Sequence, residues 1–181
     1  MAIDPPMAGI IKISVLSVCV LTSIFSLNQA TIYASVDEQK FWAGLEGEFV
    51  SPPVDTSASG MAMFRSTPAG YIWYLVNVTG IDRITSAQIH RGDIGENGPV
   101  VALLLGSNGT VTGDVNGTLT QGKITSSMLE GPYAHVNLSQ LALAMSNATT
   151  YIDVSTVDYP DGEIRGQIMS ANSTHAEIMM N

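Results

Sequence analysis

AQIHRGDIGENGPV (residues 87–100) is the segment that sets the pattern of the chain. It contains three glycines and the pair Asn97-Gly98. Glycine and asparagine adopt positive φ at low cost, so this composition is typical of a tightly specified loop. The apolar run from Val100 to Leu105 follows directly and is short enough to be a buried strand. The segment therefore predicts the end of one strand, a glycine-rich loop and the start of the next strand.

A second segment with turn residues, YPDGEIRGQ (residues 159–167), lies near the end of the chain. Pro160-Asp161-Gly162 is typical of a turn, and it predicts strands over residues 151–157 and 163–169. Glu163 and Arg165 are two residues apart on the second strand, so their side chains point the same way and can pair. Arg165 can instead bond the carbonyls of the glycine-rich loop. We favour this second, structural role over ligand binding.

The rest of the chain from Val36 onwards is a series of short apolar runs separated by turn residues. Strands are predicted over residues 41–47, 60–64, 70–78, 84–90 and 99–105, and a hairpin or twisted ribbon over 106–122. Residues 138–146 predict a short helix with Asn137 as its cap. This pattern favours an all-β fold, a mostly antiparallel, Greek-key-like β-sandwich with one helix.

The first 34 residues have the character of a signal peptide, with an apolar run from Ile10 to Leu27 and cleavage expected after Ala34. An uncleaved membrane anchor is the alternative, since the run is near the lower limit for a spanning helix. Residues 35–170 then form the folded domain, and residues 171–181 form a flexible polar tail. Cys19, the single cysteine, lies in the leader, so the mature chain is expected to hold no disulfide.

Acidic residues outnumber basic ones, and the 181-residue chain has a net charge of −9. Nucleic acid and anionic membranes require a cationic face, so this charge disfavours both as partners. The sequence contains no phosphate-binding loop, no nucleotide fingerprint and no Gly-x-Ser-x-Gly elbow. We therefore predict that the chain is not an enzyme.

Six Asn-x-Ser/Thr triplets mark candidate glycosylation sites, at Asn77, Asn108, Asn116, Asn137, Asn147 and Asn172. Combined with an export signal, they predict that at least some of these asparagines carry glycans, mainly in the 108–116 loop. Glycans would also solubilise a domain of low surface charge.

Three segments together resemble the CHRD (chordin-type) domain family, over roughly residues 41–169. They are AGLEG followed by PPV (43–47 and 52–54), HRG through ENGPV (90–100), and PDGEIRGQ (160–167). The positions that we assign to these structural motifs are Gly92, Gly95, Asn97, Gly98, Gly162, Glu163, Arg165 and Gly166. The resemblance implies an extracellular all-β domain. For chordin-type proteins it also implies binding to growth factors of the bone morphogenetic class, a role that we do not transfer to this chain.

The chain departs from the family pattern at histidine positions. The family usually has two histidines one residue apart in its central motif, and here Gln88 takes the place of the first while His90 keeps the second. A third family histidine corresponds to Ser155. His90 and Asp153 remain candidate ligands for copper, zinc or calcium. The acids Asp93, Glu96, Asp158, Asp161 and Glu163 are further candidates for calcium.

These observations predict an exported, glycosylated CHRD-type domain with a non-enzymatic binding or structural role, secreted or at the cell surface. Its expected partner is an extracellular protein or glycan, with contact to a membrane only through an uncleaved leader. One alternative is a metal-binding, redox-active protein centred on His90. Another is self-association into an envelope layer or fibre, through strand addition by residues 31–36.

Overall fold

The computed structural model describes residues 38–106 and 110–171. The predicted leader, the self-association segment 31–36, Asn108, Asn172 and the polar tail beyond Ala171 lie outside the described residues. The strands are β1 (Lys40–Glu46), β2 (Ser59–Ser66), β3 (Ile72–Ile81), β4 (Ile84–Arg91), β5 (Val100–Leu105), β6 (Val115–Ile124), β7 (Thr150–Thr156), β8 (Ile164–Gln167) and β9 (Met169–Ser170). The helical elements are α2 (Leu138–Ser146) and three 3₁₀ turns, η1 (Gly47–Phe49), η2 (Ser126–Met128) and η3 (Gly131–Tyr133).

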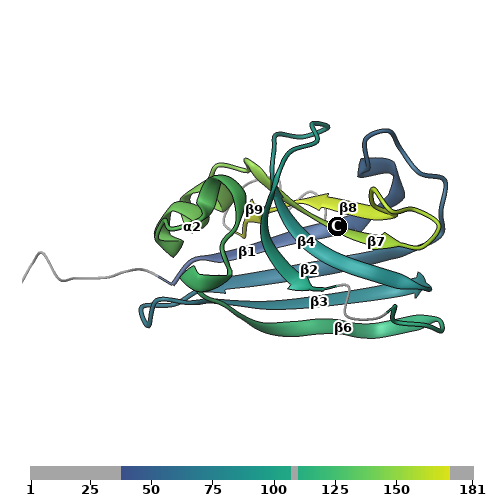
Figure 1. Ribbon diagram of the computed structural model, residues 1–181, viewed down its shortest axis with the longest axis horizontal. Helices are drawn as coiled ribbons and strands as arrows, with labels where there is room; N and C mark the ends of the chain where they lie inside the picture. The colour runs from purple at the N-terminus through teal and green to yellow at the C-terminus, as the bar shows by residue number, and fades with distance from the viewer. Residues whose placement is uncertain (1–37, 107–109, 172–181) are drawn as a thin grey trace, which may run out of the picture. The chain divides into compact units, whose positions relative to one another are not determined.

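The strands form one antiparallel sheet in the order β5-β4-β7-β8-β1-β2-β3-β6, with β9 paired to β1. This confirms the all-β prediction. Figure 1 shows β4 and β7 lying across from β2 and β3, so the curled sheet is nearly closed and encloses its core as a sandwich does. Two hydrogen bonds join the ends of the sheet: the Tyr74 hydroxyl on β3 and the Thr120 hydroxyl on β6 both donate to the Leu104 carbonyl on β5, at 3.1 and 3.4 Å.

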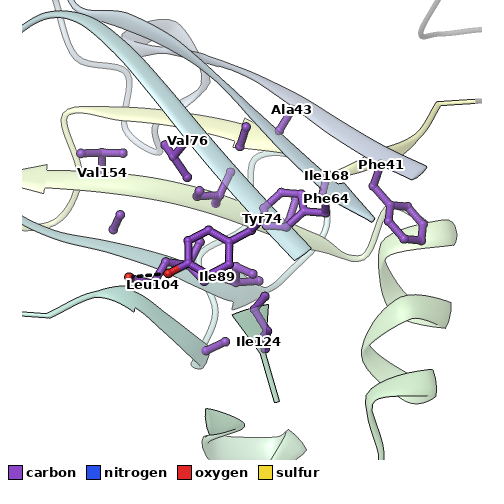
Figure 2. Packing of buried hydrophobic residues seen from close by; sticks show 14 of the residues in the cluster. Phe41, Ala43, Phe64, Tyr74, Val76, Ile89, Leu104, Ile124, Val154 and Ile168 are labelled. Carbon is purple, nitrogen blue, oxygen red and sulfur yellow. Dashed lines mark hydrogen bonds between the residues drawn. The ribbon is translucent and has the colours of Figure 1, made fainter. Parts of the chain in front are cut away.

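The core is built by the alternation of side chains along each strand. On β3 the side chains of Ile72, Tyr74, Val76 and Val78 are buried, as the period of two predicts, and Ile81 at the end of the strand is buried as well. Figure 2 shows side chains from β1, β2, β3, β4, β5 and β7 converging on this interior. The opposite face of each strand is therefore left for loops and solvent, whereas α2 adds Leu138, Leu141 and Met145 to the core.

Within the region predicted as a hairpin or ribbon, residues 115–122 belong to strand β6, which pairs along β3, and Val111 makes an isolated bridge to Ile84. A β-bulge interrupts this pairing: Val76 pairs with Thr120 and Asn77 with Thr118, which leaves Leu119 as the extra residue. The bulge breaks the alternation, which is why the apolar residues here fit neither strand nor helix spacing.

The helix α2 begins and ends at the predicted residues. The Asn137 side chain accepts a hydrogen bond from the Ser139 amide at 2.6 Å, and so caps the first turn. Within the described ranges, no helix is long and apolar enough to span a membrane.

Candidate functional site

A cluster of polar side chains lies on the outer face of β4, β7 and β8. Tyr151 and Asp153 alternate along β7 with Ile152 and Val154, which fill the core. His90 on β4 is paired with Tyr151, and Arg165 on β8 is paired with Asp153. Directly opposed residues point to the same face, so strand pairing alone brings these four side chains together. We call them the polar cluster.

The polar cluster is buried because the chain folds back over it after β4. The glycine loop (residues 92–99) rises above the sheet in Figure 1, between β4 and β5. A Cβ on Gly98 would overlap the Arg91 carbonyl oxygen, and one on Gly92 would lie 2.9 Å from the Glu96 oxygen. Glycine is therefore required at these two positions for the loop to lie this close to the sheet.

The Arg165 side chain holds the glycine loop mainly through carbonyl oxygens of the loop backbone. The side chain is only 3% exposed. Its guanidinium donates to the Glu96 carbonyl at 2.7 Å, the Asp93 carbonyl at 3.3 Å and the Asn97 side-chain oxygen at 2.9 Å. It also lies 3.4 Å from the centre of the Tyr151 ring. Burial lowers the pKa of Arg165 from its usual value, and the guanidinium still carries its charge at neutral pH.

Two further side chains fasten the same loop. The Gln167 amide donates to the Gly92 carbonyl at 2.9 Å and to the Ala148 carbonyl at 2.7 Å. The Asn97 amide donates to the Ser51 carbonyl at 2.7 Å. The glycine loop is thus tied to β8, to the end of α2 and to the segment after β1.

His90 joins the loop to Asp153. Its Nδ1–H donates to the Gly98 carbonyl at 2.9 Å, and its ring stacks on Tyr151 with centroids 4.9 Å apart. A carbonyl can only accept, so Nδ1 must carry a proton. The other nitrogen, Nε2, lies 3.3 Å from the Asp153 carboxylate. In a neutral ring, the lone pair of Nε2 would face the negatively charged carboxylate, which is repulsive. In a protonated ring, Nε2 carries a hydrogen that the carboxylate attracts.

The pKa of His90 is raised from its ordinary value of 6.5. Burial acts to lower it, but the hydrogen bond and charge of Asp153, together with the Gly98 carbonyl, outweigh burial. The charge of Arg165 opposes the increase. The pKa of Tyr151 is also raised, mainly because the phenol is desolvated.

We expect this histidine to make stability depend on pH. The folded-state pKa lies above the unfolded value of about 6.5, so protonated His90 stabilises the fold fully below that pH. The contribution is lost as pH rises through the folded-state pKa. The free energy of unfolding should therefore fall over this window in urea titrations.

The variant His90→Asn should lose this dependence, whereas His135→Asn should keep it. His135 is exposed and has a φ of 67°, which asparagine tolerates. A slope retained in His90→Asn would assign the titration to another group.

The metal candidates His90 and Asp153 are neighbours, joined by the 3.3 Å contact between Nε2 and the Oδ2 oxygen of the carboxylate. The other carboxylate oxygen, Asp153 Oδ1, has no hydrogen-bond partner among the described residues. Nowhere in residues 38–106 and 110–171 do three His, Cys, Asp or Glu side chains gather as ligands would. Gln88 lies opposite Asp153 in the strand pairing.

Glu163 does not pair with Arg165. Its two carboxylate oxygens accept hydrogen bonds from the hydroxyls of Thr56 and Thr156, each at 2.8 Å. The remaining motif glycines serve turns and close packing: Gly95 and Gly162 have φ of 80° and 117°, and a Cβ on Gly166 would overlap the Gly44 carbonyl. Asp93 and Glu96 are exposed, and it is their carbonyls that hold Arg165.

An open groove of about 810 Å³ runs beside the glycine loop. Its walls come from the loop, from η3 and from α2, and include Asp93, Glu96, Tyr133, Gln140 and Leu143. The Leu143 side chain is 60% exposed. The groove therefore combines acidic, aromatic and apolar groups. On its glycine-loop side, the backbone is held by the polar cluster.

Sequence reasoning missed Tyr151 and Gln167 as parts of this site. Tyr151 is two residues before Asp153, and Gln167 is two residues after Arg165. The available signal was the alternation of side chains along a strand, because it places Tyr151 on the same face as Asp153 and Gln167 on the same face as Arg165.

The geometry defines a class: an all-β domain in which a glycine loop is fastened over a buried arginine. Comparison with known proteins then shows the family of the chain. The CHRD domain family model matches residues 41–168. Chordin from Xenopus laevis is 32% identical over 143 residues, which is 75% of this chain and 13% of that protein. Chordin from Danio rerio is 31% identical over 130 residues, covering 71% of this chain and 13% of that protein.

The chain belongs to the CHRD domain family. It spans about an eighth of the length of the curated relatives that it matches, so the activities of those complete proteins are not assigned to this chain. No solved structure matches the chain.

Proposed function

We propose that this chain is an exported, non-enzymatic binding module that acts outside the cell or at its surface, with an extracellular protein as its partner. Membership in the CHRD family, whose matched relatives are chordins, supports an extracellular role without catalysis. The observation that carries the proposal is the use of the polar cluster. Its hydrogen-bonding groups hold the backbone of the glycine loop, which leaves the loop as a rigid surface for contact.

The binding surface that we assign is the groove between the glycine loop and α2. Leu143 on one wall is a large exposed apolar side chain, and Ile94 at the tip of the loop is 72% exposed. Apolar anchors surrounded by polar groups are typical of protein interfaces. Since the loop is already ordered, binding there has little conformational entropy to lose.

Export and glycosylation are parts of the same proposal. Asn116, Asn137 and Asn147 are exposed, and Asn77 is half-buried on the outer face of β3. In Asn77, Asn116 and Asn137 the side-chain oxygen accepts a hydrogen bond, which leaves the nitrogen for a glycan. We expect the chain recovered from the medium or surface of its own cells to begin after Ala34 and to lose mass on treatment with an N-glycosidase. Intact-mass analysis and N-terminal sequencing check both expectations.

The binding proposal is tested with the labelled full chain and the intact cells that produce it. Saturable binding is expected, and Leu143→Glu should weaken it at least tenfold, because a charge replaces an apolar anchor. Val157→Glu is the matched control: Val157 is 50% exposed and lies outside the lining of the groove. Its binding should equal that of the parent chain.

Equal binding by the parent and Leu143→Glu would contradict the assigned surface. Metal analysis of the same preparation tests the alternative in which His90 and Asp153 together bind a metal ion. Stoichiometric copper or zinc that is lost in His90→Asn would show that the chain is a metalloprotein and would contradict the proposal of a binding module.

A further inference from the structure

The sheet half formed by β1, β2, β3 and β6 carries an ordered pattern on its outer face, away from the glycine loop. Figure 1 shows these four strands side by side. Strand pairing aligns their outward residues in rows. The first row is Lys40, Arg65, Trp73 and Lys123, and the second is Trp42, Met63, Leu75 and Gln121.

The first row concentrates positive charge on an acidic protein. It holds three of the seven lysines and arginines in a chain with a net charge of −9. Among the described residues, Arg65 forms an ion pair with Glu38 at 3.5 Å, and both side chains are about half exposed, so the pair is weak. Lys123 lies 4.4 Å from the centre of the Tyr71 ring, which leaves its charge unneutralised. The row therefore offers a cationic edge to solvent.

The second row adds an apolar strip beside the charges. Met63 is 42% exposed, and the neighbouring Met61 is 48% exposed. A shallow groove of about 270 Å³ lies between the rows, with Lys40, Met63, Arg65, Trp73 and Leu75 in its lining. An occupant of this groove would meet flat apolar surface and cations together.

The strands beneath the groove restrict what this occupant can be. β1 and β2 are paired on both sides, as is β3, so their backbone groups are used within the sheet. A peptide added as an extra strand would find no edge beneath the groove, because the edge strand of this sheet half, β6, contributes none of the groove lining. It would therefore lack the main-chain hydrogen bonds that give such peptides their affinity. Pyranose rings need no backbone partner: their C–H faces pack on aromatic and thioether side chains, and carboxylates pair with lysine and arginine.

We propose that this outer face binds a linear acidic polysaccharide, with its carboxylates on the row of Lys40, Arg65 and Lys123 and its sugar rings on Trp73 and Met63. Charge complementarity with the basic row selects an acidic chain over a neutral one. This site is separate from the groove beside the glycine loop, so the two proposals stand or fall independently.

The test is calorimetric titration of the full chain with polygalacturonate oligosaccharides, with neutral dextran of similar length as the control ligand. Binding of polygalacturonate is expected, and it should weaken as salt rises from 50 to 200 mM because screening shortens the reach of the charges. The triple variant Lys40→Gln/Arg65→Gln/Lys123→Gln should bind at least tenfold more weakly. The double variant Arg83→Gln/Arg91→Gln removes two cations from other parts of the described surface, and it should bind like the parent chain.

A second variant tests the ring contact separately from the charge. Met63→Ser, at an exposed position, should weaken binding severalfold without changing the slope of affinity against salt. Binding that is equal for dextran, or unchanged in the triple variant, would overturn the proposal. Tighter binding of poly-glutamate than of polygalacturonate would assign the face to an acidic peptide instead, and no binding of either acidic ligand would remove the site.

Discussion

Arg165→Met is expected to lower the free energy of unfolding by about 2–4 kcal/mol. Methionine keeps much of the apolar volume but has no donors. The Glu96 and Asp93 carbonyls and the Asn97 side chain then lose the partner that holds them 2.7–3.3 Å from the guanidinium. When the donor is removed, the acceptors stay desolvated but no longer have a hydrogen bond to compensate for it. The loss of stability should therefore exceed that from removing an exposed ion pair. Urea denaturation with a fluorescence readout measures it.

Two comparisons separate the fork geometry of Arg165 from its charge. Arg165→Lys retains the charge but cannot span three acceptors, so its stability should lie near that of Arg165→Met. Arg83→Met is the control on the surface, where Arg83 pairs with Asp158 and both side chains are about half exposed; its loss should stay below about 1 kcal/mol. Hydrogen exchange should show residues 92–99 opening in Arg165→Met. If these amides remain as protected as in the parent chain, the loop is held by other contacts.

The interior of this fold follows from local pattern. On β3 the period of two separates Tyr74 and Val76 from Trp73 and Leu75, and the structure buries the first pair. The helix α2 was readable from Asn137, because a capping oxygen acts on an amide only two residues away. Such features need no knowledge of the remote chain.

The candidate site depends on contacts that a local pattern does not contain. Glu163 illustrates this limit: spacing suggested a pair with Arg165, but its carboxylate is taken by Thr56, 107 residues earlier in the chain. The pairing of β4 with β7, which sets His90 beside Tyr151 and Asp153, likewise joins distant segments. The bulge at Leu119 is a third case, since the extra residue is defined only by its partner strand. The motif residues and the contact of Arg165 with the glycine-loop carbonyls were identifiable from the sequence, whereas the partners of Glu163 and His90 required the fold.

Gly98→Ala is expected to destabilise the domain by at least about 3 kcal/mol, the largest effect of any single methyl group in the glycine loop. An added Cβ would overlap the backbone oxygen of Arg91, which is held by strand β4 and cannot move aside like the end of a flexible side chain. Displacing Gly98 would also break two bonds, from its amide to the Tyr151 hydroxyl at 3.1 Å and from His90 to its carbonyl at 2.9 Å. Thermal unfolding measures the loss.

The matched control for this prediction is Gly95→Ala in the same loop. A Cβ on Gly95 meets nothing within 4 Å, so the cost is limited to its φ of 80°, about 1 kcal/mol. The ratio between the two variants isolates the steric requirement at Gly98 from the general cost of alanine in a turn. Equal losses would mean that the loop moves as a unit away from the sheet. The polar cluster would then hold it less firmly than its hydrogen bonds indicate, and the rigid surface on which the binding proposal depends would be lost.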